Sequence, residues 1–451
     1  MPDTRRCRCR TLRRSPKRSR VICSLRCINY RVAAGGCLRK CKWQKIANSN
    51  IINTIAIGAL AVCAIGSAIA VSSSAPPQRR PIRIAAFGTL TGPVRSFGIN
   101  SRATLKAAAE RIDAAGGVKL KDGSIGFFDV SYADDHCKPD EAIDIVQRAA
   151  ASEAILGIGP SCSSVAEPLY GELQRRVGDG ADRGLQFPIF TDGATKADLA
   201  KISQWAFRNA PNEGDMYTAL WKWVSAKYPD LKTVYAGEEG DFAHSHSTWE
   251  KIIKVEAETA GFTVTGSVSW SINDTAFAEQ AKSIAAANAD VAVISAHALS
   301  TCGVLKELTH LKYRPKLLVG LTSSSTPETL KLCGADAEGL LIPTSFIATT
   351  RETIEEALEV SRCGGIADLH GMAAWEILYT VKRVIEQQGI VPTPASVTAD
   401  RRKLRDGLAS LETMQGVLGT IKRRADRESL KPFVLAQVQS SEWKVVFTPP
   451  T

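Results

Sequence analysis

The sequence lacks the short motifs of the common nucleotide-dependent and hydrolytic enzymes. It contains no P-loop, no H-E-x-x-H zinc motif and no G-x-S-x-G nucleophile elbow. The glycine-rich run at residues 157–162 lacks the third glycine of a dinucleotide fingerprint, and Pro160 has no N–H to offer a pyrophosphate. His244 and His246 are close in sequence, but they fit a polar loop before a helix better than a metal site. We therefore expect no cofactor, no metal ion and no catalytic residue.

Net positive charge is lacking outside the N-terminus, although the chain of 451 residues carries a net charge of +11. Residues 1–50 hold 15 of the 57 Lys and Arg residues and one of the 46 Asp and Glu residues. The rest of the chain therefore holds 42 basic and 45 acidic residues, and the basic ones form no stripe. Because nucleic-acid-binding domains present such a stripe, we expect no nucleic-acid partner.

Residues 1–80 are expected to form a basic leader, an export segment and a linker. Seven of the twelve cysteines lie in residues 1–63, and their spacings form no repeated C-x2-C pair that would predict a zinc site. Residues 51–71 carry no charge, follow a basic stretch and contain an A-x-A sequence at residues 68–70, as a secretory signal peptide does. The prediction is an exported, periplasmic protein.

Two alternatives for this segment remain open. The apolar run approaches the roughly 20 residues that span a bilayer, so residues 51–71 also fit an uncleaved membrane anchor. Cys63 follows a sequence close to a lipoprotein box, but Val62 stands where a small residue is usual. We further hypothesise that residues 1–37 reflect a start codon assigned too far upstream.

From residue 82 onward, short apolar runs alternate with segments of helical periodicity. Predicted strands lie at residues 82–88, 127–133, 154–159, 187–191, 233–237, 264–270, 291–296, 316–321 and 340–344, with a terminal pair at 433–438 and 443–447. Predicted helices lie at residues 140–151, 164–175, 215–227, 246–260, 277–286, 302–311, 370–388 and 400–411, and another starts with Asn100 as its N-cap. This alternation predicts an α/β protein with two doubly wound parallel-sheet lobes, whose ligand binds between them at the carboxyl ends of the strands.

Three polar loops follow strands of the first predicted sheet, at residues 88–93, 159–164 and 192–195. In the second loop, backbone N–H groups and hydroxyls converge at a helix N-terminus, which is an arrangement that binds anions. Taken singly, Ser163, Ser164 and Thr195 also fit the role of helix caps. Because the three loops share one edge of the sheet, we predict a cradle for a ligand carboxylate.

Six short motifs follow one another along the body of the chain. They are Gly88…Thr91-Gly92-Pro93…Phe97-Gly98, Ala115-Gly116-Gly117-Val118, Asp134-Asp135-His136-Cys137-Lys138-Pro139, Gly159-Pro160-Ser161-Cys162-Ser163-Ser164, Gly193-Ala194-Thr195 and Glu338-Gly339-Leu340-Leu341. Their order and spacing resemble the branched-chain amino-acid-binding (Leu/Ile/Val-binding) proteins of bacterial ABC transporters, which are type I periplasmic solute-binding proteins. The resemblance covers about residues 81–447.

The resemblance implies a three-stranded hinge with crossings near Asn209, near Pro343 and after Gly419. Lobe 1 would then comprise residues 81–208 plus 345–419, and lobe 2 residues 209–344 plus 420–451. The resemblance further implies which residues contact the ligand. Ser163, Thr195 and the backbone of Gly193 would bind its carboxylate, and Phe97 and Phe242 would be aromatic residues of the cleft.

The resemblance also implies a disulfide between Cys137 and Cys162. A bridge closing a loop of this size stabilises a fold by about 3 kcal/mol in a chain-entropy model, and it fits an oxidising compartment. Cys302 and Cys333 are a second candidate pair, which would leave Cys363 unpaired.

One departure from the family pattern concerns the ligand ammonium. Amino-acid binders of the family place a carboxylate after the strand that corresponds to residues 316–321, where this chain has Thr322 followed by three serines. An ammonium without a counter-charge is costly in a closed cleft. Glu238, Glu239 and Asp241 are alternative partners for an ammonium. Otherwise an aromatic or short organic acid fits better, with His297 as a hydrogen-bonding residue.

We therefore expect a monomeric, non-enzymatic binding protein of an ABC importer that closes two lobes on a small carboxylate and then docks on an inner-membrane permease. Two alternatives come from other classes. An uncleaved segment at residues 51–71 would favour a membrane-tethered ligand sensor. The α/β pattern alone would also suit an enzyme.

Overall fold

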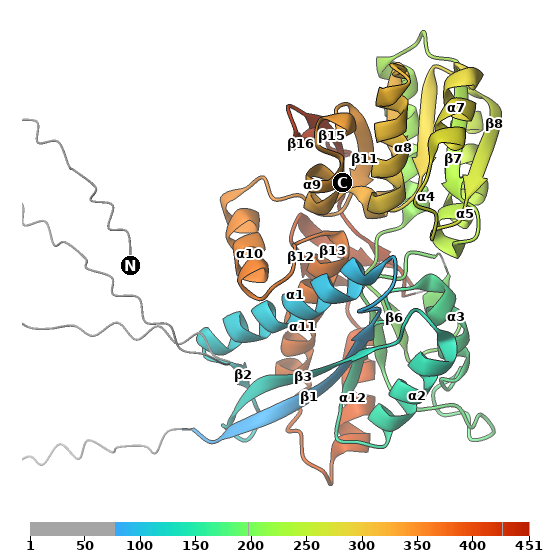
Figure 1. Cartoon of the computed structure of the whole chain (residues 1–451). Helices are drawn as coiled ribbons and strands as arrows, with labels where there is room; N and C mark the ends of the chain where they lie inside the picture. Colours follow the sequence, from blue (N-terminus) through green and yellow to red (C-terminus); the bar gives the residue numbers. More distant parts are fainter. Residues whose placement is uncertain (1–76, 197, 426, 451) are drawn as a thin grey trace, which may run out of the picture. The chain divides into compact units, whose positions relative to one another are not determined.

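A computed structural model describes residues 77–196, 198–425 and 427–450 (Figure 1). The predictions about the basic leader, the start codon, the apolar segment at residues 51–71 and Cys63 concern residues outside these ranges. Within these ranges, none of the helices has both the length and the apolar character needed to cross a lipid bilayer.

The first sheet has six strands in the order β2-β3-β1-β4-β5-β6. All neighbours are parallel except β2, which pairs antiparallel with β3. The strands are β1 (Arg79–Gly88), β2 (Val118–Lys119), β3 (Ile125–Asp134), β4 (Leu156–Ile158), β5 (Ile189–Thr191) and β6 (Ala206–Arg208). The helices that follow these strands in the chain are α1 (Arg95–Ala114), α2 (Pro139–Ala150) and α3 (Ser163–Gly171).

The second sheet has seven strands in the order β16-β15-β11-β10-β9-β7-β8. Its strands are β7 (Thr233–Glu239), β8 (Thr263–Trp270), β9 (Val291–Ser295), β10 (Leu317–Gly320), β11 (Leu340–Thr344), β15 (Val434–Gln439) and β16 (Glu442–Phe447). Its helices are α4 (Glu213–Lys227), α5 (Ala243–Thr248), α6 (Lys254–Thr259), α7 (Ala278–Ala287), α8 (Ala298–His310) and α9 (Pro327–Cys333). The helix expected at residues 246–260 is thus interrupted, because a π-helical turn at Trp249–Ile253 separates α5 from α6.

The two sheets share one doubly wound topology. Counting only their parallel strands in chain order, each runs 2-1-3-4-5. In such a sheet the strand order reverses between the first and third strands, and ligands bind outside the carboxyl ends of these two. The reversal lies between β1 and β4 in the first sheet and between β7 and β9 in the second. The fold class predicted from the sequence is confirmed.

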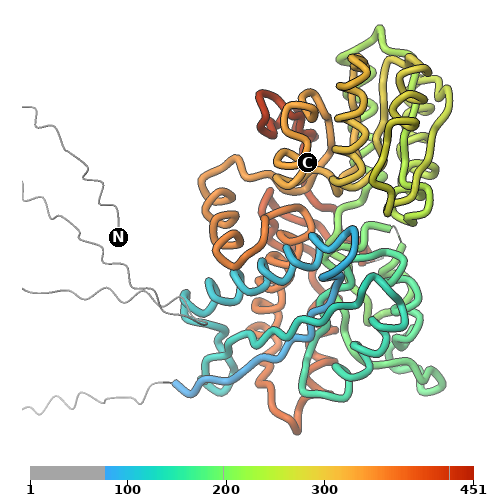
Figure 2. Tube along the Cα trace, in the orientation of Figure 1, coloured from blue at the N-terminus to red at the C-terminus, as the bar shows by residue number. Residues whose placement is uncertain are grey.

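The chain passes between the two sheets three times (Figure 2). It leaves the first sheet after β6, and it leaves the second after β11 to form α10 (Arg351–Arg362), α11 (Leu369–Gln388) and α12 (Val397–Ala409). A small sheet of β12 (Thr413–Gly416), β13 (Gly419–Arg423) and β14 (Ser429–Leu430) then precedes the return to β15. This small sheet, α9 and α10 were not expected from the sequence.

Buried apolar side chains cover both faces of each sheet. On one face of the first sheet, residues of β1 and β3 pack with α1, α11 and α12, and on the other face β1 and β5 pack with α2 and α3. The second sheet packs with α7, α8 and α9 on one face and with α4 and α6 on the other. Strands such as β4, β9 and β10 are buried along their whole length, as expected for parallel strands enclosed by helices.

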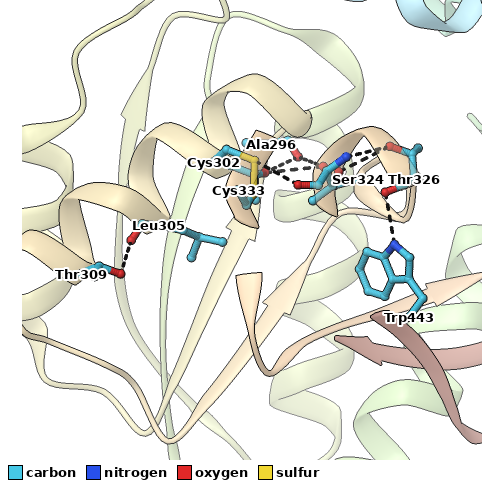
Figure 3. Close-up of a disulfide and its surroundings, with 10 residues drawn as sticks. Ala296, Cys302, Leu305, Thr309, Ser324, Thr326, Cys333 and Trp443 are labelled. Carbon is cyan, nitrogen blue, oxygen red and sulfur yellow. Dashed lines mark hydrogen bonds between the residues drawn. A yellow bond between two sulfur atoms is a disulfide. The ribbon is translucent and has the colours of Figure 1, made fainter. Parts of the chain in front are cut away.

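Two disulfides fix loops near the carboxyl ends of the strands. Cys137 bonds to Cys162, the residue before α3, which confirms the predicted pair. Cys302 of α8 bonds to Cys333 at the end of α9, close to the loop in which Ser324 donates a 2.7 Å hydrogen bond to the carbonyl of Ala296 (Figure 3). Cys363 is a free thiol.

Candidate ligand-binding cleft

Three of the predicted ligand contacts meet where the carboxyl ends of the two sheets face each other. Phe97 lies in the first turn of α1, beside the first sheet, while Phe242 and His297 are the residues before α5 and α8 of the second. The His297 ring centroid lies 5.5 Å from that of Phe97 and 4.9 Å from that of Phe242. Side chains from both lobes therefore enclose one imidazole.

His297 is held in place by Glu239, the last residue of β7. Glu239 Oε2 lies 2.5 Å from His297 Nδ1, and Glu239 Oε1 accepts the backbone N–H of His297 at 3.1 Å. Ser245 Oγ donates to the same carboxylate at 2.7 Å. Burial disfavours the charged form of Glu239, but His297 and the hydrogen bonds outweigh it and lower its pKa to about 2.

A second buried carboxylate, Glu213 at the start of α4, was not expected from the sequence. It accepts from His244 Nε2 and from Thr248 Oγ, each at 2.9 Å, and also from the hydroxyl of Thr322. Burial opposes its ionisation, yet His244 and the hydroxyl donors lower its pKa to about 2. The pKa of His244 is raised in turn, since Glu213 outweighs the effect of burial.

These contacts change the expectation about negative charge at Thr322. The position itself carries no acid, but Glu213 contacts its hydroxyl, so a carboxylate from another element occupies this place. Glu239 also reaches the cleft, whereas Glu238 pairs with the half-exposed His246 and Asp241 accepts from Ser271. Each cleft carboxylate is already paired with a histidine, so an incoming ammonium would have to compete with an imidazole.

The structure places Ser163 and Thr195 in neighbouring loops of the first lobe. Ser163 is the first residue of α3 and is partly exposed, and its Oγ accepts the backbone N–H of Lys196 at 3.2 Å. Thr195 is buried, and its carbonyl accepts from Arg208 at 2.9 Å. A Cβ on Gly193 would lie 2.7 Å from the Cα of Ser161, so only glycine allows the two loops to approach this closely.

The α3 helix contacts α5 of the second lobe, so these loops open toward the side of the cleft that holds Phe242. No hydrogen bond described for residues 77–450 joins Ser163 or Thr195 to the cluster around His297. Their role in binding a carboxylate therefore remains a prediction.

Little free space remains beside Phe97 and His297 in this conformation. A cavity of about 30 Å³ is lined by Phe97, His297, Ser323 and Thr326, among others. This volume holds roughly one or two water molecules. A ligand of several heavy atoms therefore needs the lobes to separate before it enters.

Comparison with known proteins agrees with this architecture. The sequence model of the periplasmic binding protein family matches residues 81–442. The chain belongs to this family. A curated relative, the Leu/Ile/Val-binding protein homolog 3 of Brucella melitensis biotype 1, is 24% identical over 339 residues, which cover 75% of this chain and 86% of the relative. The family predicted from the sequence motifs is confirmed.

Solved structures of similar proteins share the fold. A solute-binding protein of an ABC transporter from R. palustris, in complex with 4-hydroxybenzoate, superposes with a TM-score of 0.67 at 17% identity, covering 82% of this chain and 97% of that one. The branched-chain amino-acid transporter substrate-binding protein LivJ of Streptococcus pneumoniae, in complex with isoleucine, also gives 0.67, at 15% identity over 82% and 99% of the chains. At these identities the likeness concerns the fold alone.

Proposed function

We propose that this chain is the periplasmic binding protein of an ABC importer and that it closes its two lobes on a small carboxylate. The observation that carries the proposal is the meeting of Phe97 from one lobe with Phe242 and His297 from the other, at the strand ends where doubly wound sheets bind ligands. The family membership supports the same role. The closed form would then dock on a membrane permease, and the chain acts as a binder rather than an enzyme.

The ligand we favour is an aromatic or short organic acid. Phe97 and Phe242 offer apolar faces, and the carboxylates of Glu213 and Glu239 are held by His244 and His297. An α-amino acid would need one of these carboxylates for its ammonium, since an unpaired buried charge is costly. The R. palustris relative bound to 4-hydroxybenzoate shows that this fold accommodates such an acid.

The mechanism is a shift of population between open and closed lobes. A ligand that contacts both lobes only in the closed form stabilises that form by the difference in its contacts. The carboxylate would bind to Ser163, Thr195 and the backbone of Gly193, and the remainder of the ligand would lie near Phe97 and Phe242.

The first prediction concerns Ser163 and Thr195. Thermal unfolding of the full chain is measured with benzoate, 4-hydroxybenzoate, short organic acids, leucine and isoleucine. At a concentration of 100 Kd, binding stabilises the folded state by about 2.7 kcal/mol, so a bound acid raises the Tm. The double variant Ser163→Ala/Thr195→Ala should lose this rise while its ligand-free Tm stays within a few degrees of wild type.

Ser164→Ala is the matched control, because this neighbouring hydroxyl is exposed. It should leave the ligand-dependent rise unchanged. Wild-type affinity in the double variant would show that the carboxylate is bound elsewhere. A rise with leucine or isoleucine but with none of the acids would overturn the proposed ligand class.

A further inference from the structure

Three buried side chains near Phe97 carry polar atoms that have no hydrogen-bonding partner among the described residues. They are both ring nitrogens of His370, Nε2 of His297 and Oγ of Ser323. The His370 ring centroid lies 4.6 Å from that of Phe97, and Phe97, His297 and Ser323 line the same small cavity. These groups form a polar subsite, by which we mean His370, His297 Nε2 and Ser323 Oγ together.

The subsite is assembled from both lobes. His370 is the second residue of α11, whose side chains pack in the core of the first lobe, and it is 2% exposed. His297 and Ser323 follow β9 and β10 of the second lobe and are 6% and 2% exposed. Because buried polar groups in folded proteins nearly always have partners, three such groups around one aromatic ring point to a bound molecule.

The charge state of His370 indicates which chemical group the subsite accepts. Burial, reinforced by the nearby His244, lowers the pKa of His370 to about 3, so its imidazole is neutral in ordinary buffers. A neutral imidazole offers one N–H donor and one nitrogen acceptor. A hydroxyl group, which both donates and accepts, complements this pair.

Charged groups on the ligand fit the subsite less well. An ammonium would lie near His244, whose pKa is raised, and near Lys431, which also acts on His370. A carboxylate would lie near Glu213 and Glu239, which are both ionised. Because Glu213 and Glu239 are each already paired with a histidine, neither charged group would gain a free counter-charge here, whereas an uncharged hydroxyl needs none.

We propose that His370 is a specificity-determining residue that binds a hydroxyl group on the ligand, together with His297 Nε2 and Ser323 Oγ. This inference rests on the proposed function, in which the ligand's carboxylate lies on the loops of Ser163 and Thr195. The ligand class is then a ring-hydroxylated aromatic acid, whose ring packs against Phe97 at the 4.5–7 Å spacing usual for aromatic pairs. A ligand that lacks the hydroxyl would leave the subsite unpaired and bind more weakly.

The test is calorimetric titration of the full chain with benzoate, 3-hydroxybenzoate and 4-hydroxybenzoate. Wild type should bind one of the hydroxylated acids about tenfold or more tightly than benzoate, which corresponds to about 1.4 kcal/mol. His370→Leu should reduce this ratio toward one by weakening the hydroxylated acid while benzoate affinity is retained. His370→Gln, whose amide also donates and accepts, should keep part of the preference.

Two further variants make the result interpretable. His246→Leu removes a half-exposed histidine that pairs with Glu238 outside the subsite, and it should leave the ratio unchanged. Ser323→Ala removes a hydroxyl from the opposite lobe and should lower the ratio as well, which keeps the test decisive if leucine at position 370 prevents folding. Ligand-free melting of each variant reports on folding.

The outcomes separate this inference from the proposed function. Equal affinity for benzoate and both hydroxybenzoates in wild type, or an unchanged ratio in both His370→Leu and Ser323→Ala, overturns the role of the subsite and leaves the carboxylate-binding function standing. Absence of binding by all three acids overturns the role of the subsite, whereas the carboxylate-binding function is contradicted only if the short organic acids of the thermal-unfolding screen fail to bind as well.

Discussion

At the scale of single residues, buried carboxyl groups near the cleft link the fold to pH. Asp192 follows β5 and is 1% exposed; its Oδ2 accepts from Ser101, and its Oδ1 lacks a partner within the described part of the chain. Burial raises its pKa from 3.8 to about 7. Burial likewise raises the pKa of Asp135, which follows β3, to about 6.

Replacement of Asp192 by asparagine should alter the pH dependence of stability. A carboxyl whose pKa is higher in the folded than in the unfolded chain contributes stability that is complete below about pH 4 and is lost as the pH rises through 7. The Asp192→Asn variant has no titrating carboxyl at this position, so it does not lose this stability as the pH rises. Its Tm relative to wild type should therefore rise between pH 5 and pH 8, by about 2 °C or more.

Asp144→Asn is the control for this experiment, because Asp144 lies exposed on α2. Its Tm difference from wild type should stay constant over the same range. A constant difference for Asp192→Asn as well would show that this carboxyl is already ionised at pH 5.

Some residues of the cleft could be predicted from the sequence, and others could not. Phe97 and Phe242 were expected from the resemblance to the family and His297 from its place after a strand, and the structure brings the three together. Glu213 and His370 were not predicted, because each lies in a helix whose sequence gives no sign of the side chain it will face. Only the packing of α4 and α11 against distant loops shows their surroundings.

At the scale of elements, buried ion pairs lie where the chain passes between the lobes. Lys431, just after β14, pairs with Glu376 of α11 at 2.6 Å, and both side chains are almost fully buried. Glu376 also accepts from Asn209, just after β6, at 2.8 Å. Arg208 and Glu428 form a second buried pair at 2.6 Å. Residues at two of the three passages are thus joined through one carboxylate.

Removal of Lys431 should destabilise the fold strongly. Deleting one partner of a buried ion pair leaves the other charge uncompensated, which costs about 3–5 kcal/mol. Lys431→Met should lower the free energy of unfolding in denaturant by this amount, and adding Glu376→Gln should recover part of the loss because the uncompensated charge is removed.

Lys282→Met tests an exposed pair for comparison. Lys282 and Glu279 lie on the surface of α7, where solvent screens such pairs and they contribute little to stability. A loss for Lys431→Met as small as that for Lys282→Met would show that the pair at the passage is not buried in solution.

Elements were predictable to the extent that their own sequence carries an apolar pattern. The strands expected at 82–88, 291–296 and 340–344 correspond to β1, β9 and β11. By contrast, α10 was not expected, although Ile354, Ala357 and Leu358 lie at helical spacing and Thr350 caps its first turn. Asn100 was expected to cap α1, but the helix begins at Arg95, and the Asn100 side chain instead bonds to Asp368 at 2.7 Å. That partner is 268 residues away, so local pattern does not indicate it.

At the scale of the whole described chain, the alternation of strands and helices was sufficient to predict two doubly wound lobes. The positions of the two strand-order reversals, and of the loops that face the cleft, come from the strand order in the structure, because the same alternation also fits other doubly wound orders. The small sheet of β12, β13 and β14 was not predictable, because its strands are short and only partly buried. The degree of closure depends on side-chain contacts between lobes and was likewise not predictable.

The central claim is that one carboxylate ligand bridges both lobes and closes them. Hydrogen–deuterium exchange of the full chain, with and without the acid that raises the Tm most, tests it most directly. We predict ligand-dependent protection of the first-lobe segments 89–97 and 159–164 together with the second-lobe segments 240–248 and 296–301, and no change in α7. Protection confined to one lobe, or absent from both, would contradict closure on a shared ligand.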